Sequence, residues 1–166
     1  MNNNTLIVYY SWSEDTDLVA RQIQSVTGGT LLRLIPQLPY PTDYYKCVEQ
    51  AKLELKEKAT PALQPFSLDL QQYDTVFLGS PIWCGTFASA IRTFLSEYDL
   101  SGKTVLPFCC HGGGGQRNFT NDLRGLLDGS NIKETLVLFG SGGSSGKKEI
   151  SSWVRRNFPI AEKTGK

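Results

Sequence analysis

The sequence predicts an α/β protein in which a five-stranded parallel sheet, with strand order 2-1-3-4-5, is doubly wound and covered by helices as a three-layer sandwich. Two observations predict this fold. Five short runs, rich in β-branched and aromatic residues, alternate with segments of helical period. The runs are apolar on both faces, as in parallel strands that helices cover on each side. The length of 166 residues, 40% of them hydrophobic, suits a single domain over residues 1–166.

The first half of the chain is expected to contain two strands and two helices. Leu18, Val19 and Ile23 share one stripe of the first helix, which a glycine pair ends. Helical spacing returns after a stretch that prolines interrupt. In order, the expected elements are a strand at Thr5–Tyr10, a helix from Asp15 to Gly28, a strand at Thr30–Ile35 and a helix from Tyr44 to Lys58.

Three more strands, each followed by a helix, complete the pattern after an irregular connection. The expected strands are Thr75–Gly79, Thr104–Cys110 and Glu134–Gly140. The helices that follow them carry, in turn, Phe87, Ile91, Phe94 and Tyr98, then Phe119, Leu123 and Leu126, then Ile150, Trp153 and Val154. Strands that alternate with helices in this way form the doubly wound order, which binds ligands beyond the carboxyl ends of its strands.

Charge and cysteine content narrow the classes of function. The net charge is +1, from 17 basic and 16 acidic residues, so the chain lacks the basic surface that nucleic acids require. The N-terminal segment MNNNTLIVYY has no basic region and is too short for a signal peptide or a membrane span. The four cysteines and the one histidine form no zinc-like set, so we expect no metal site, free thiols and a cytoplasmic location.

The loop after the first strand is a candidate phosphate site. Ser11, Ser13 and Thr16 supply three hydroxyl groups beside the free N–H groups at the start of a helix. Such a cradle can bind a dianion without lysine or arginine, because the N–H donors and the helix dipole attract it. The alternative is an ordinary helix start with Ser13 as its N-cap.

The loops after the third and fourth strands open toward the same crevice. The run Gly79–Thr86 combines a Ser-Pro turn with Ile82 and Trp83, which can present apolar and aromatic surface to a flat ring. The run Cys109–Gly115 has four consecutive glycines, whose bare backbone allows close approach of a planar ligand or an anion. Alternatively, Trp83 is a core aromatic and the glycines form a flexible loop.

At these residues the chain resembles the flavodoxin family, and in particular its short-chain, FMN-binding bacterial members. The segment Tyr73–Phe94 resembles the family's third strand and flavin loop, and YPTDY at Tyr40–Tyr44 and PFCCHGGGG also match. The resemblance implies that Ser11, Ser13 and Thr16, with the amides of Trp12, Glu14 and Asp15, hold the FMN phosphate. It also implies that the isoalloxazine is lined by Pro81, Ile82, Trp83, Cys84 and Gly85 on one side and by Cys110, His111, Gly112 and Gly113 on the other.

One departure from the family pattern lies in the phosphate loop. Glu14 occupies the family's glycine position, and Asp15 that of a common asparagine. Two carboxylates near a phosphate dianion repel it by an amount on the order of 4 kcal/mol at about 4 Å in a surface-like dielectric. We therefore expect both side chains to point outward, so that only the backbone amides face the phosphate.

Several alternatives stay open at this point. The segment SGGSSGK at Ser141–Lys147 fails the P-loop template at two positions and is expected to be a helix entry. Cys84, with His111 as base, would suit a cysteine-dependent hydrolase. A flavin-free interaction domain is a third alternative, which Glu14 and Asp15 favour.

With flavin bound, the protein would be either an electron carrier, with a redox partner protein, or an oxidoreductase linked to NAD(P)H and acting on a small acceptor such as a quinone. The small net charge disfavours a carrier steered by charge.

Overall fold

The computed structural model describes residues 4–158, so the predicted domain extends beyond the described residues at both ends. Its strands form one sheet in the order β2-β1-β3-β5-β6, with β4 on β3 and β7 on β5. All pairings are parallel except that of β3 with β4. The strands are β1 (Thr5–Tyr9), β2 (Thr30–Arg33), β3 (Thr75–Trp83), β4 (Thr86–Phe87), β5 (Thr104–His111), β6 (Asn131–Ile132) and β7 (Leu136–Phe139).

The predicted order is confirmed, and its fifth place is shared by two short strands. β6 pairs with the start of β5, and β7 pairs with its end. Only residues 133–135 separate the two strands, and the Lys133 N–H still donates to the Val105 carbonyl at 2.9 Å. The edge strand therefore has a short interruption and no long insertion.

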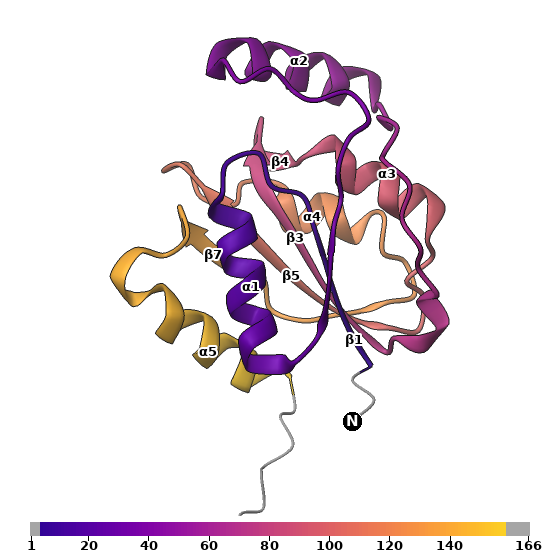
Figure 1. Cartoon of the computed structure of the whole chain (residues 1–166), viewed down its shortest axis with the longest axis vertical. Helices are drawn as coiled ribbons and strands as arrows, with labels where there is room; N and C mark the ends of the chain where they lie inside the picture. The colour runs from indigo at the N-terminus through magenta and orange to yellow at the C-terminus, as the bar shows by residue number, and fades with distance from the viewer. Residues whose placement is uncertain (1–3, 159–166) are drawn as a thin grey trace, which may run out of the picture.

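Helices cover both faces of the sheet (Figure 1). α1 and α5 lie on one face, and α3 and α4 lie on the other. The helices are α1 (Asp15–Thr27), α2 (Tyr44–Glu57), α3 (Ser89–Glu97), α4 (Phe119–Arg124) and α5 (Gly146–Asn157), with short 3-10 turns at Leu70–Gln72 and Gly143–Ser145. The predicted helix entry after the last strand is thus confirmed. Within residues 4–158, no helix combines the length and apolarity that a transmembrane span requires.

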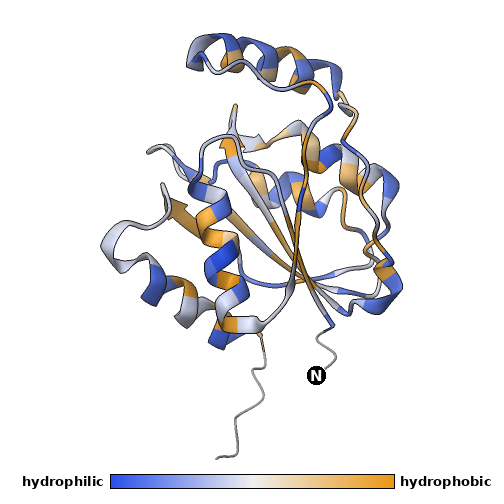
Figure 2. Cartoon of the chain, viewed as in Figure 1, coloured by the Kyte–Doolittle hydropathy of each residue, from blue (hydrophilic) through white to orange (hydrophobic). Residues whose placement is uncertain are grey.

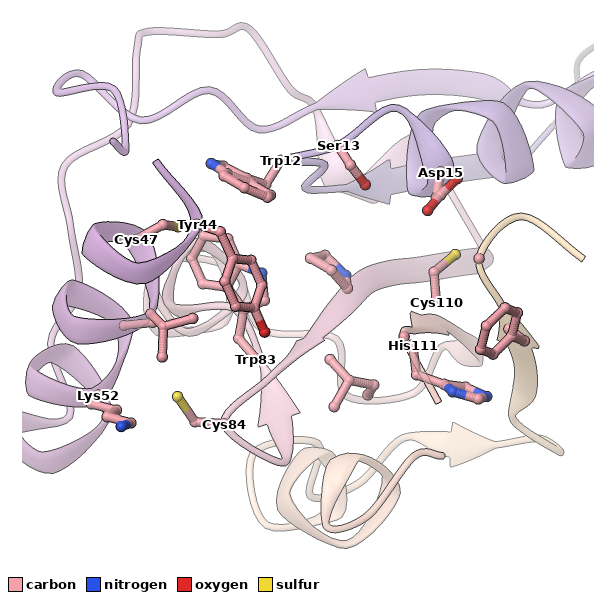
Figure 3. Close-up of a pocket in the computed structure, with 17 residues that line it drawn as sticks. Trp12, Ser13, Asp15, Tyr44, Cys47, Lys52, Trp83, Cys84, Cys110 and His111 are labelled. Carbon is pink, nitrogen blue, oxygen red and sulfur yellow. The ribbon is translucent and has the colours of Figure 1, made fainter. Parts of the chain in front are cut away.

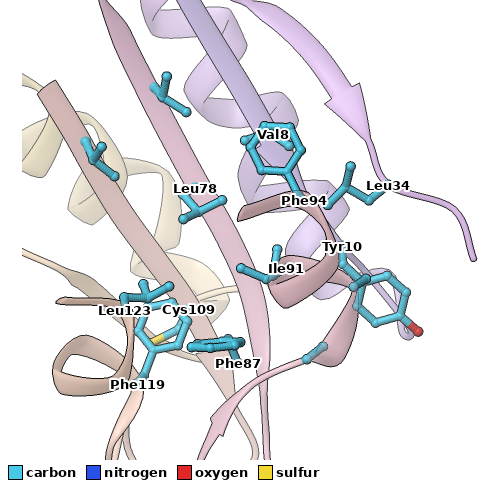
Figure 4. Packing of buried hydrophobic residues seen from close by; sticks show 14 of the residues in the cluster. Val8, Tyr10, Leu34, Leu78, Phe87, Ile91, Phe94, Cys109, Phe119 and Leu123 are labelled. Atoms are coloured by element: carbon cyan, nitrogen blue, oxygen red, sulfur yellow. The ribbon is translucent and has the colours of Figure 1, made fainter. Parts of the chain in front are cut away.

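Two hydrophobic clusters, one on each face, hold the layers together. Alternate residues of β1 enter opposite clusters: Leu6 and Val8 face α3, whereas Ile7 faces α1 and α5. Figure 4 shows Val8 and Leu78 packed against Ile91, Phe94 and other residues of the first cluster. Figure 2 shows the corresponding pattern, with apolar residues along the central strands and polar residues on the outer helix faces.

The segment after the predicted third strand differs from expectation. Ser80 and Pro81 are not a turn: β3 continues through them, paired with Cys109 and Cys110 of β5. The chain reverses instead at Cys84–Gly85, a two-residue hairpin in which φ is 51° and 81°. Phe87, predicted to lie in a helix, pairs with Ile82 in β4 because this hairpin brings it back along β3.

The second helix, α2, lies beyond the carboxyl ends of the strands, apart from the two helical layers (Figure 1). Its inner side carries Cys47, Ala51 and Glu54, all buried. The Tyr40 hydroxyl donates a 2.6 Å hydrogen bond to Glu54 Oε2, and both side chains are buried. This contact fixes α2 to the chain segment that precedes it.

Candidate functional site

A cavity of about 610 Å³ lies at the carboxyl ends of β1, β3 and β5. Its volume suits a cofactor or other small ligand. The predicted cofactor residues that line it are Trp12, Ser13, Asp15, Pro81, Ile82, Trp83, Cys84, Cys110, His111 and Gly112. Figure 3 shows the labelled side chains around the cavity, with Ser13 and Asp15 at one end and Cys84 and Lys52 at the other.

The remaining wall was not predicted from the sequence. It is formed by one side of α2 and by the end of β7, through Tyr44, Cys47, Val48, Ala51, Lys52, Phe139 and Gly140. Because α2 stands over the carboxyl ends of the strands, it closes the cavity on the side away from the sheet. The predicted residues Ser11, Glu14, Thr16, Gly85 and Gly113 are not among the lining side chains.

The hydroxyl groups of the loop after β1 have different surroundings. Ser11 is buried; its hydroxyl donates to the Ser13 carbonyl and accepts from the Asp17 N–H at 3.3 Å. Thr16 is buried and hydrogen-bonded to Cys110. Only Ser13 faces the cavity. Two of the three hydroxyls therefore order the loop, and the third lies where a ligand can reach it.

The start of α1 supplies further donors. The N-cap residue is Glu14, with no side-chain capping bond, so the alternative that Ser13 is the N-cap is wrong. The first N–H groups of any helix lack intrahelical acceptors. Here the Asp17 N–H is occupied by Ser11, which leaves the N–H groups nearer the cavity to attract an anion.

The expectation for the two acidic residues is half right. Glu14 points outward, 72% exposed, with its Oε1 3.8 Å from Arg33 Nη2. Asp15 was also expected to point outward, but it lines the cavity, with Oδ2 near Gly140. The helical turn that begins at residue 15 explains the difference, because successive side chains of a helix point about 100° apart. Asp15 therefore places negative charge inside the site.

The sequence did not predict a buried network that lies behind the loop. Asp17 is 5% exposed and accepts hydrogen bonds from Tyr9 Oη, Arg21 Nε at 2.9 Å and Arg33 Nη1 at 3.4 Å. Burial alone would raise the pKa of Asp17, but these hydrogen bonds and the two arginine charges outweigh it and lower that pKa. The only signal available in the sequence was the i,i+4 spacing of Asp17 and Arg21.

Aromatic rings form the side of the cavity beneath α2. Trp83 makes edge contacts with Tyr10 and Tyr40, at centroid separations of 5.3 Å and 4.8 Å. Trp12 lies 6.5 Å from Tyr44, and its Nε1 donates to the Pro41 carbonyl at 3.2 Å. Trp83 is thus both packed against neighbouring rings and open to the cavity, so the site presents a fixed aromatic surface.

The opposite side is built by the end of β5. The His111 Nδ1 accepts a 3.0 Å hydrogen bond from the Gly113 N–H, and its ring makes an edge contact with Phe139. An acceptor at Nδ1 leaves the proton of the neutral ring on Nε2. Gly113 has a φ of 131°, a backbone conformation that glycine adopts without steric strain. This conformation lets the Gly113 N–H point back toward the His111 ring.

The cysteines do not have the surroundings of a nucleophile. Cys84 lies on an exposed hairpin rather than at a helix start, and desolvation raises its pKa. Burial raises the pKa of Cys109 and Cys110 to about 12 each. Their side chains enter opposite clusters of the sheet, which does not suit a vicinal disulfide. No group of His, Cys, Asp and Glu side chains in residues 4–158 is arranged to hold a metal ion.

Comparisons with known proteins agree with this geometry. The flavodoxin family model matches residues 4–157. Two solved proteins described as flavoproteins, from Bacteroides eggerthii and Bacteroides uniformis, are 27% and 26% identical, both with a TM-score of 0.82. The alignments cover 95% and 92% of this chain, and 99% and 98% of theirs.

A third structure is a flavoprotein from Lactobacillus acidophilus solved in complex with FMN. It is 25% identical, with a TM-score of 0.74, and the alignment covers 91% of this chain and 98% of that one. No curated protein matches the chain. The family match spans nearly all the residues whose sheet, helices and cavity are described above. The chain belongs to the flavodoxin family.

Proposed function

We propose that the chain binds one FMN in the cavity and acts in electron transfer or in the reduction of a small acceptor. The observation that carries the proposal is the pairing, within one cavity, of a helix start rich in N–H donors with a wall of fixed aromatic rings. A phosphate suits the first feature, and a flat ring suits the second. The FMN-bound relative from Lactobacillus acidophilus supports the same ligand.

The side chains present fit the parts of FMN. Ser13 and the N–H groups at the start of α1 would hold the phosphate, while Ser11 and Thr16 would support that loop from behind. Trp83 and Ile82 would contact the ring system from β3, and Cys110 and His111 from β5. Among the residues that line the cavity in the described part of the chain, Asp15 is the acidic side chain, and it opposes the phosphate.

Bound FMN supplies the redox chemistry, and the protein controls its surroundings. The side chains of α2 exclude water from one side of the cavity. The His111 Nδ1 accepts from the Gly113 N–H, so the neutral ring carries its proton on Nε2 and would offer a hydrogen-bond donor at the wall of the flavin site. We expect His111→Ala to change the midpoint potential, because this donor is lost; an unchanged potential would reject this role.

Of the two redox roles, we favour reduction of a small acceptor. The net charge of +1 gives little electrostatic steering toward a protein partner, and α2 narrows access to the cavity. The free thiols of all four cysteines support the proposed cytoplasmic location. Reduction tests with NADH and NADPH, followed by a quinone, separate the roles: direct reduction by a nicotinamide supports an oxidoreductase, and reduction only by a protein partner supports a carrier.

The flavin-free interaction domain remains the competing proposal because Asp15 faces the phosphate end of the cavity. An absorbance spectrum decides between the two. A yellow preparation with flavin bands supports FMN binding. A colourless protein that takes up no added FMN supports the flavin-free alternative.

A further inference from the structure

Arg33 lies at the end of β2, outside the loops that line the cavity, yet its guanidinium contacts the loop after β1 and the first turn of α1 at three points. Nη2 donates to the Ser11 carbonyl at 3.3 Å and lies 3.8 Å from Glu14 Oε1. Nη1 lies 3.4 Å from Asp17 Oδ1. Parallel pairing places Arg33 opposite Tyr9, the last residue of β1, and therefore beside the start of this loop.

The same loop is braced from within by Ser11. Its hydroxyl donates to the Ser13 carbonyl and accepts from the Asp17 N–H, so the turn from β1 into α1 is closed by side-chain and backbone bonds. The planar guanidinium of Arg33 contacts the outer side of the same turn. With the contacts of both Ser11 and Arg33 in place, Ser13 faces the cavity and Glu14 faces away from it.

Charge around the loop is unbalanced without Arg33. Glu14, Asp15 and Asp17 place three carboxylates within the first turn of α1 and its N-cap. Arg21 is bonded to Asp17 at 2.9 Å, and its side chain is 61% exposed. Arg33 is only 35% exposed and is the cation shared by Glu14 and Asp17. A partly buried charge is less screened than an exposed one, so Arg33 has the larger effect on an anion at the helix start.

We propose that Arg33 is a positioning residue for the FMN phosphate: it holds the loop after β1 in its binding shape and offsets the charge of Glu14. This inference rests on the proposed binding of FMN. It explains how a loop with glutamate at the family's glycine position can still accept a dianion. The charge of Glu14 is turned outward and paired with Arg33, so that Asp15 is left as the carboxylate that lines the cavity.

The test compares the dissociation constants of FMN and riboflavin, measured by quenching of flavin fluorescence. Riboflavin lacks the phosphate, so it reports on the ring site alone. We expect Arg33→Met to weaken FMN binding by about tenfold or more, and riboflavin binding by less than about twofold. Arg33→Lys, which keeps the charge and loses the planar guanidinium, should give an intermediate loss.

Arg21→Met is the matched control, because Arg21 shares Asp17 with Arg33 but does not contact Ser11 or Glu14. We expect it to change FMN binding by less than about threefold. Glu14→Gln in the Arg33→Met background should recover part of the lost affinity. Thermal unfolding of each variant without flavin confirms that it is folded.

Three results would overturn the proposal. Equal losses for FMN and riboflavin would show that Arg33 only supports the structure. A loss in Arg33→Met no larger than that in Arg21→Met would remove its special role. An absence of recovery with Glu14→Gln would contradict the charge offset. If the wild-type protein bound riboflavin and FMN equally or bound neither, the phosphate site of the proposed function would itself be wrong.

Discussion

Replacing Tyr40 by phenylalanine removes one hydroxyl group from the contact that fixes α2. That hydroxyl donates to Glu54 Oε2 at 2.6 Å, and both side chains are buried. The ring contacts remain, because phenylalanine keeps the ring that lies 4.8 Å from Trp83 and 5.9 Å from Tyr10. The substitution therefore isolates the hydrogen bond.

The expected loss is about 1.5–3 kcal/mol in the free energy of unfolding, the range for a hydrogen bond to a charged group. Within residues 4–158, the hydrogen bond that Glu54 then keeps is a long one from Gln50 Nε2, at 3.4 Å, so its buried carboxylate is left poorly satisfied. In a Glu54→Gln background the acceptor is neutral, and the same Tyr40→Phe change should cost about 1 kcal/mol.

Urea unfolding of the four proteins in this double-mutant cycle measures the coupling. Tyr45→Phe is the matched control, since Tyr45 lies at the start of the same helix and is 77% exposed. It should change stability by less than about 0.5 kcal/mol. Because α2 lines the cavity, Tyr40→Phe should also weaken FMN binding. A Tyr40→Phe protein as stable as the Tyr45→Phe control would show that the Tyr40–Glu54 hydrogen bond does not stabilise the fold.

Three further predictions concern charge and thiols. Asp15→Asn should tighten FMN binding by about tenfold, because it removes the one carboxylate that lines the cavity; weaker binding in the fluorescence titration would contradict this. The pKa of Asp17 is lowered in the folded protein, so its stabilising effect is present above its ordinary value of 3.8 and is lost as the pH falls below that value. Asp17→Asn should thus destabilise the protein at pH 7, with a difference that narrows below about pH 4 in urea unfolding; a constant difference would refute the linkage. Iodoacetamide should label Cys84 first, because Cys109 and Cys110 are buried with pKa values near 12; peptide mass mapping that finds either buried thiol modified first would contradict the assignment.

The sheet and most helices were predictable because their signals are local. The apolar runs that became β1 and β5 and the amphipathic stripe of α1 depend on residue spacing alone. The continuation of β3 through Ser80–Trp83 was not predicted, because glycine and proline, at Gly79 and Pro81, are typical of turns when only the local sequence is considered. Pairing with a long neighbouring strand outweighs that local preference.

The candidate site was predicted where it follows strand ends and missed where it depends on distant pairing. Trp83 and His111 come directly from the ends of β3 and β5. The wall formed by α2 follows a long proline-rich connection, whose path no local pattern specifies. Arg33 reaches the loop after β1 only because β2 pairs with β1 in one register. The orientation of Asp15 depends on where the first helical turn begins.

Titration of FMN into the flavin-free protein, followed by quenching of flavin fluorescence, measures whether the cavity binds FMN through its phosphate. We predict saturation at one FMN per chain with a dissociation constant tighter than micromolar, and weaker binding of riboflavin, which cannot use the start of α1. The titration should fail to saturate in a variant whose Trp83 is replaced by alanine, at concentrations that saturate the wild type. Binding of FMN weaker than micromolar, or no preference for FMN over riboflavin, would show that this cavity is not an FMN site.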